Sequence, residues 1–109
     1  MKKIEAYIRP SSLTVYHKAL IDAGAKGITV WQTKGIGATY HEDNKTVVFR
    51  GTEVKKNYID RVRVEIVVED DNLENIIACL KETAKNPSLG TLQVFVIPVL
   101  ESFRIPSEE

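Results

Sequence analysis

Apolar and polar residues alternate along several segments of the chain, and this period of two predicts strands with one buried face. The first segment covers residues 3–9 and ends at Pro10, and the most regular one covers residues 61–68. Two more strands are expected at about residues 27–33 and 92–96. The apolar positions of the first and third strands are Ile4, Ala6, Ile8, Val62, Val64, Ile66 and Val68.

Apolar residues three or four positions apart predict two helices, each with one buried side. The first is expected to be capped by Ser11 or Ser12 and to end at Gly24. The second is expected to begin with a capping box formed by Asp71 and Glu74. The buried positions are Leu13, Tyr16, Leu20 and Ala23 in the first helix and Leu73, Ile76, Ile77 and Leu80 in the second.

The predicted order of elements, β-α-β-β-α-β, is that of a ferredoxin-like α+β domain. A loop of about residues 36–56 separates the second and third strands, and loops above about 12 to 15 residues are usually functional or disordered. Residues 47–49 are expected to add a short strand inside this loop. Both helices should lie on one face of the sheet. The other face mixes charges with Tyr7, Trp31 and Val67, so it is either solvated or packed against a sister subunit.

Composition narrows the class of protein. The 109 residues suit a single domain, which we expect to span residues 1–109. Fifteen basic residues balance fifteen acidic ones, so no overall field attracts nucleic acid or an anionic membrane. No window approaches the roughly 20 apolar residues of a membrane helix. The single Cys79 cannot form an internal disulfide, which suits a reducing compartment. We therefore expect a cytoplasmic protein that does not insert into membranes.

The sequence contains no pattern that predicts catalysis. It offers no nucleophile with a neighbouring base and no pair of carboxylates in a plausible cleft, so we expect a non-enzymatic protein. His41, Glu42 and Asp43 are adjacent in the long loop. Such a group is typical of a solvated loop tip rather than a metal site, and no bound metal is expected.

Gly35, Ile36 and Gly37 follow the second predicted strand and have two interpretations. Glycines let backbone N–H groups approach a phosphate closely, and Arg61 and Arg104 can add charge-assisted contacts. Alternatively, the glycines only make a turn and both arginines pair with acidic residues at subunit contacts. The acidic candidates are Glu5, Glu65 and Glu101.

The chain resembles the PII signal-transduction family along nearly its whole length. The motifs that carry the resemblance are residues 1–6, Arg9-Pro10, residues 27–30, residues 34–37, residues 50–53 and residues 62–68. The resemblance implies a homotrimer whose intersubunit clefts hold ATP or ADP, as a regulatory ligand rather than a cofactor. It also implies that the long loop, the family's T-loop, contacts a protein target such as a membrane transporter or a metabolic enzyme.

The resemblance further implies which residues bind the nucleotide. The adenine pocket is expected at Tyr7, Gly27, Ile28, Thr29, Glu65 and Val67. The phosphate site is expected at Gly35, Ile36, Gly37, Ala38, Arg61, Gly90, Thr91, Leu92, Gln93, Arg104 and Pro106.

Several positions depart from the family pattern. Ala38 stands where a phosphate-binding arginine is common, and residues 90–93 replace a Gly-Asp-Gly-Lys-type turn and thereby lose a lysine. Thr39 replaces a glutamine that helps to hold magnesium and 2-oxoglutarate. Val54 replaces a tyrosine that some members have uridylylated. The chain is therefore identified as a divergent, PII-like member.

The leading hypothesis is a nucleotide-binding signalling protein that senses energy state and regulates a transporter or metabolic enzyme through its T-loop. The alternative is an assembly or interaction module of PII-like fold that has lost nucleotide binding, or that binds another small anion or a cyclic nucleotide. A small ferredoxin-like enzyme is disfavoured because no catalytic set is present.

Overall fold

The computed structural model describes residues 1–36, 46–49, 52–55 and 58–106, and it confirms the ferredoxin-like α+β fold. The strands of the main sheet are β1 (Lys2–Ile8), β2 (Thr29–Gly35), β5 (Ile59–Val68) and β6 (Gln93–Pro98). The helices are α1 (Leu13–Asp22) and α2 (Leu73–Thr83), and the 3-10 turns are η1 (Pro10–Ser12), η2 (Asp70–Asn72) and η3 (Pro87–Leu89). A separate two-stranded sheet pairs β3 (Thr46–Phe49) with β4 (Thr52–Lys55).

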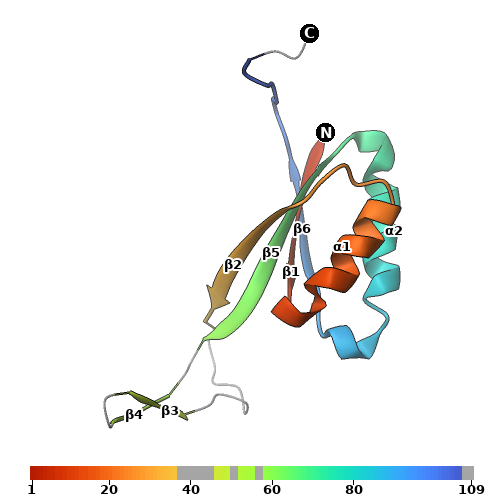
Figure 1. Cartoon of the computed structure of the whole chain (residues 1–109). Coiled ribbons are helices and arrows are strands. Elements are labelled where there is room, and N and C mark those ends of the chain that lie inside the picture. The colour runs from red at the N-terminus through yellow and green to blue at the C-terminus, as the bar shows by residue number, and fades with distance from the viewer. Residues whose placement is uncertain (37–45, 50–51, 56–57, 107–109) are drawn as a thin grey trace.

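The main sheet is antiparallel, with strand order β2-β5-β1-β6, and α1 and α2 lie side by side on one of its faces (Figure 1). The register sets Glu65 of β5 opposite Glu5 of β1 and Thr29 of β2. No described element covers the other face, which we call the open face. Because side chains alternate between the two faces of a strand, the same pattern of residues predicts both the face that the helices cover and the open face.

Two predicted strand boundaries were wrong by about two residues. β2 begins at Thr29 and continues to Gly35, because its pairing with β5 runs from Thr29 opposite Glu65 to Gly35 opposite Ile59. β6 continues to Pro98, which an edge strand tolerates because one side of it needs no N–H donor. The short strand predicted at residues 47–49 is confirmed as β3.

The predicted N-terminal caps of both helices were wrong, whereas the predicted end of the first helix at Gly24 is confirmed. Ser12 precedes α1, but its buried hydroxyl makes no cap hydrogen bond and instead donates to the backbone carbonyl of Leu89 over 3.0 Å. Asn72 precedes α2, and its side chain makes no cap hydrogen bond either. Ser12 thus ties the start of α1 to the turn before β6, a tertiary contact that local sequence does not reveal.

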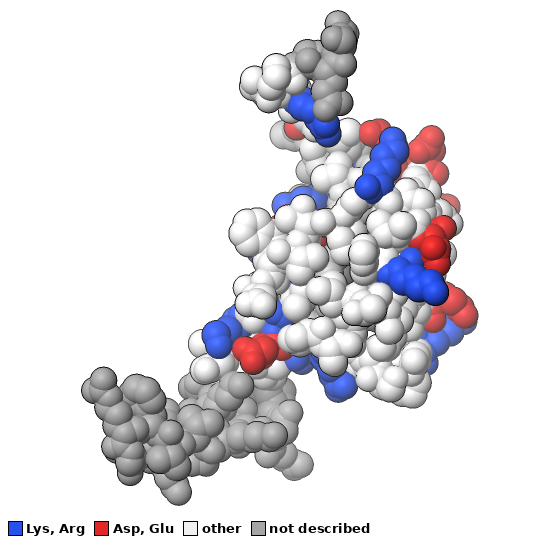
Figure 2. All heavy atoms as spheres, viewed as in Figure 1, with Lys and Arg blue, Asp and Glu red and all other residues white. Residues whose placement is uncertain are grey.

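In the view of Figure 2 the middle of the face carries mostly uncharged side chains, and basic and acidic side chains lie intermingled mainly along its edges. This distribution agrees with the equal numbers of the two kinds of residue. Among the described residues, no helix is long and apolar enough to cross a membrane.

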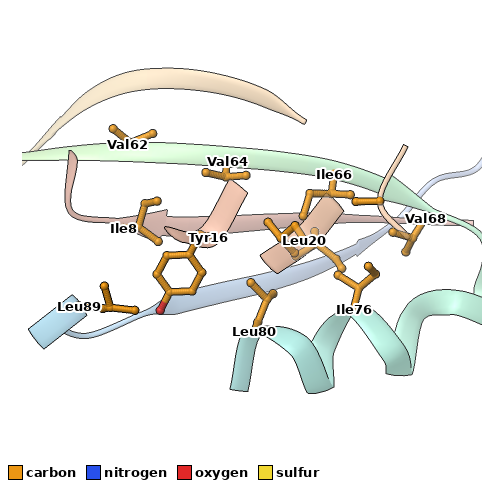
Figure 3. Close-up of a cluster of buried hydrophobic side chains, with 12 residues drawn as sticks. Ile8, Tyr16, Leu20, Val62, Val64, Ile66, Val68, Ile76, Leu80 and Leu89 are labelled. Carbon is orange, nitrogen blue, oxygen red and sulfur yellow. The ribbon is translucent and has the colours of Figure 1, made fainter. Parts of the chain in front are cut away.

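The core lies between the two helices and the sheet face that they cover (Figure 3). Its buried side chains come from β1, β5, the two helices and the turn before β6: Ile4, Ile8, Tyr16, Leu20, Val62, Val64, Ile66, Val68, Ile76, Leu80 and Leu89. Each such side chain contributes roughly 1.5–3 kcal/mol on full burial. Ile28 and Val94, from the second and fourth predicted strands, are only partly buried, and Val30 of β2 is exposed. Tyr16 is only 2% exposed, and its hydroxyl has no hydrogen-bond partner within the described part of the chain. Burial raises the pKa of this hydroxyl.

Candidate functional site

The expected nucleotide-binding residues form two groups at opposite ends of the main sheet. At the end where β2 finishes and β6 begins, the loop end, lie Gly35, Ile36, Arg61, Gly90, Thr91, Leu92 and Gln93. At the opposite end, the tail end, lie Gly27, Ile28, Thr29, Glu65 and Val67. Thr29 and Gly35 are six positions apart in β2, which is about 20 Å at about 3.3 Å per residue. Tyr7 of β1 lies nearer the loop end, opposite Arg63 and Gln93.

A hollow of about 380 Å³ at the loop end is lined by Pro10, Gln32, Thr33, Lys34, Asp60, Arg61 and Val62. Its neighbours hold Arg61 in place. The Arg61 guanidinium donates to the backbone carbonyl of Asp60 over 3.0 Å, and the Thr33 hydroxyl donates to the carbonyl of Arg61 over 3.2 Å. The hollow therefore presents a positioned guanidinium, a group suited to phosphate or carboxylate.

Lys34 is a second cation of this hollow. Its ammonium lies 3.4 Å from an Asp60 carboxylate oxygen and 4.1 Å from the centre of the Tyr58 ring. Partial burial acts to lower the pKa of Lys34, but Tyr58 and Asp60 outweigh it and raise the pKa above its ordinary value. Asp60 offsets part of the positive charge, so this hollow is only moderately cationic.

A second hollow of about 800 Å³ lies beside the turn of residues 90–92, and we call it the basic groove. It is lined by Arg9, Lys81, Ala84, Lys85, Pro87, Gly90, Thr91, Leu92 and Val94. Gly90 has a φ of +78°, and a Cβ there would lie 2.5 Å from Nε of Arg9. The positive φ therefore favours glycine at this position, and the absence of a Cβ leaves room for the Arg9 side chain where it lies.

Glu65, an expected adenine contact, belongs to an ion-pair network on the open face. Its carboxylate lies 3.1 Å from the Lys3 ammonium and 3.3 Å from the Arg63 guanidinium, and Lys3 also pairs with Glu5 at 3.1 Å. The Lys3 hydrogen bond is the main reason that the pKa of Glu65 is lowered; burial acts against it, and the charges of Lys3 and Arg63 lower the pKa further. Glu5 and Glu65 thus pair with Lys3 and Arg63, both of which the sequence prediction had left without a role.

Large apolar side chains surround this network on the open face. Trp31 is 50% exposed, Val67 56% and Phe95 49%. The Arg63 guanidinium stands 5.4 Å from the centre of the Trp31 ring, and Tyr7 meets Phe95 edge to face with ring centres 6.1 Å apart. The open face is therefore an ordered mixture of aromatic, aliphatic and paired charged groups.

Arg104 and Pro106 lie in the segment that follows β6. This segment leaves the tail end and extends away from the sheet and helices (Figure 1), and Leu100, Phe103 and Ile105 are largely exposed along it. Arg104 and Arg61 therefore belong to opposite ends of one protomer.

Some expectations fall on residues that the structure does not describe. Gly37 and Ala38 of the phosphate site lie outside the described residues, as do His41, Glu42 and Asp43. Within the described ranges, no group of three His, Cys, Asp or Glu residues could hold a metal ion.

Arg9, Lys81 and Lys85 are the basic residues that the sequence-based site prediction missed. Lys81 and Lys85 are four positions apart, a spacing that sets side chains on the same side of a helix and could have marked them as a pair. Their approach to Arg9 and to the turn of residues 90–92 depends on the tertiary fold.

Comparison with known proteins defines the class to which this fold and these surfaces belong. The whole chain, residues 1–109, matches the family described as Nitrogen regulatory protein P-II. A protein of that name from Azospirillum brasilense is 38% identical over 109 residues, which cover 100% of this chain and 95% of the relative. The corresponding proteins of Rhizobium meliloti (strain 1021) and Pasteurella multocida (strain Pm70) are 37% and 35% identical, with the same coverage. The class is that of regulatory signalling proteins, and the chain belongs to the PII family.

Proposed function

We propose that the chain is a homotrimeric regulator that binds ATP or ADP in clefts between subunits. The bound nucleotide reports energy state and biases the T-loop, about residues 36–56, toward or away from a protein target. The target is a membrane transporter or a metabolic enzyme, and the names of the relatives favour one that serves nitrogen metabolism. A nucleotide can act in this way only if it binds the two loop arrangements with different affinity.

One observation carries this proposal: Thr29 and Gly35, which belong to the two groups of expected site residues, are about 20 Å apart at the ends of β2 in one protomer. A single nucleotide can touch both groups only if the tail end of one subunit lies beside the loop end of another. The split is therefore what a site between subunits requires.

Gly27 and Gly35 support the same proposal. A Cβ at Gly27 would meet nothing within 4 Å, and one at Gly35 would be 3.8 Å from the carbonyl oxygen of Ile59, an ordinary contact. Packing within the protomer therefore demands glycine at neither position. A ligand or neighbouring subunit that approaches the backbone closely would explain why both positions are glycine.

The open face favours the second candidate function, an assembly module without a nucleotide. Glu65 already has two cationic partners in the protomer, so it needs no ligand to satisfy its charge. An open face of this kind can hold subunits together whether or not the clefts bind anything.

Calorimetric titration of the full chain with ATP and ADP separates the two candidates. We expect both nucleotides to bind, and Arg61→Ala to weaken both by about tenfold or more, since a well-made charge-assisted contact contributes about 1.5–3 kcal/mol. Lys18→Ala, which removes an exposed cation from α1, is the control and should leave both affinities unchanged. A trimer that binds neither nucleotide would contradict the first candidate and support the second, the assembly module. Titrations with AMP, cyclic di-AMP and 2-oxoglutarate test the other ligand classes.

A further inference from the structure

We propose that the basic groove is a binding site for a polyphosphate group, with Lys81 and Lys85 as its main contacts. Neither lysine is among the residues expected to bind the nucleotide. The turn of residues 90–92, however, belongs both to the groove and to the expected phosphate site. The site lies on the side of the sheet that the helices cover, because Val94 in its wall pairs with the buried Ala6.

The first argument is the local excess of positive charge. The chain as a whole has equal numbers of basic and acidic residues, whereas the lining of the groove includes Arg9, Lys81 and Lys85 and no carboxylate. The hollow around Arg61 differs, because Asp60 shares its lining with the cations. Of the two hollows, the basic groove is therefore the one with the more positive lining.

The second argument is the way the fold brings these cations together. Arg9 follows β1, whereas Lys81 and Lys85 come from the last turn of α2 and the segment just after it. Arg9 reaches the groove across Gly90, where any Cβ would collide with its side chain. A glycine with a φ of +78° thus gives the arginine its position in the wall of the groove.

The ion pair between Lys85 and Glu82 does not close the groove. Lys85 lies 2.8 Å from a carboxylate oxygen of Glu82, and both side chains are largely exposed. Exposed pairs of this kind contribute little to stability, so a phosphate can take Lys85 from Glu82 at small cost.

A purely structural role for the lysines is the main competing explanation, since cations stabilise the C-terminal end of a helix. Most of the carbonyls of that end are already engaged. The carbonyls of Leu80, Glu82 and Thr83 accept from backbone N–H groups, and that of Cys79 accepts from the Thr83 hydroxyl over 2.8 Å. The lysines are therefore not needed to satisfy these carbonyls.

The size of the groove and the clustering of its cations favour a polyphosphate over an acidic protein segment. Its volume of about 800 Å³ lies within the range of about 300–1,000 Å³ that is usual for small-molecule sites. Lysine ammonium groups bind phosphate as point charges, and three cations around one hollow suit a ligand with several adjacent phosphates. An acidic peptide would instead need cations spaced along an extended surface.

Titration of the full chain with inorganic tripolyphosphate at low salt tests the proposal. We expect wild-type protein to bind it, Lys81→Glu to weaken binding by about tenfold or more, and Lys85→Gln to weaken it in the same direction. Lys18→Glu makes the same charge change on the exposed side of α1 and should alter the affinity less than about twofold, as a distant exposed charge is screened. Thermal unfolding of each variant separates a loss of binding from a loss of stability.

Absence of tripolyphosphate binding to the wild-type protein would overturn the proposal, as would equal effects of Lys81→Glu and Lys18→Glu. Tighter binding of a poly-glutamate peptide, with the same dependence on Lys81, would assign the groove to an acidic partner instead. Loss of tripolyphosphate binding in Arg61→Ala but not in Lys81→Glu would assign the anion to the hollow around Arg61. If ATP and ADP still bind and Lys81→Glu has no effect on tripolyphosphate binding, the proposal that the basic groove binds polyphosphate is refuted. The proposed function is then left intact.

Discussion

Gly24 and Gly27 are three positions apart, yet they are glycine for different reasons. Gly24 has a φ of +100°, so the end of α1 requires a residue without a Cβ. Gly27 has no positive φ, and a side chain there would point into open space. The first glycine serves the fold of the protomer. The second is explained by nothing inside the protomer.

This difference predicts opposite results for two alanine variants. Gly27→Ala should leave the free energy of unfolding unchanged or raise it by about 0.4–1 kcal/mol, because alanine restricts the unfolded chain. The same variant should weaken ADP binding by crowding the expected adenine pocket. Urea unfolding and calorimetric titration measure the two effects.

Gly24→Ala is the matched control for that experiment. It should lower the free energy of unfolding by more than Gly27→Ala changes it, since alanine is strained at a positive φ. The folded protein should still bind ADP. Equal destabilisation by the two variants, or unchanged ADP affinity in Gly27→Ala, would contradict this interpretation.

At the scale of the elements, β1 and β5 are joined across the open face by the charges of Lys3, Glu5, Arg63 and Glu65 as well as by their backbones. The pKa of Glu65 is lowered in the folded protein, chiefly by its hydrogen bond to Lys3. A carboxyl with a lowered pKa contributes stability above its ordinary pKa of 4.5, and this contribution is lost as the pH falls through the folded value.

Glu65→Gln should therefore destabilise the protein at pH 6 and should do so progressively less toward pH 3. Urea unfolding at one fixed protein concentration across this range measures the difference between variant and wild type. Glu69→Gln changes an exposed carboxyl outside the network and should show no such convergence. A difference for Glu65→Gln that stays constant with pH would contradict the role of the network.

The strands and the core could be predicted from the sequence because alternation and helical spacing are local signals. Val62, Val64, Ile66 and Val68 face the core as their spacing requires, and all four are buried. The first turn of α1 was mispredicted because Ser12 finds a distant partner in Leu89 that outcompetes a local cap. Sequence motifs also supplied the two groups of expected site residues, but not their separation to opposite ends of the sheet.

The basic groove could not be predicted, since its cations come from separate segments. Arg9 and Lys81 are distant in the sequence, and only the tertiary fold brings them to one hollow. The ion pairs of Glu65 were also missed, because Lys3 and Glu65 become neighbours only through the register of β1 against β5.

At the scale of the whole molecule, the open face predicts assembly. Val67→Glu should convert the proposed trimer into monomers, because a new carboxylate would be buried beside Glu65 without a partner. Light scattering at micromolar concentration measures the mass, and circular dichroism checks that the fold is intact. Val15→Glu is the matched control: Val15 is 46% exposed on α1, and this variant should remain a trimer.

A wild-type monomer at that concentration, with its fold intact, would contradict both the trimer and a nucleotide site between subunits. A trimer that tolerates Val67→Glu as well as Val15→Glu would show that subunits meet through a different surface.

The strand order also has a consequence for folding during synthesis on the ribosome. β1 is made first but lies between β5 and β6, which are made late, so both of its backbone edges wait for most of the chain to be translated. A nascent chain halted after β5 would have one edge of β1 unpaired, and unpaired edges recruit other chains. Productive folding of this protein is therefore expected to be largely post-translational, because β6, the last strand to be made, must pair with the remaining edge of β1.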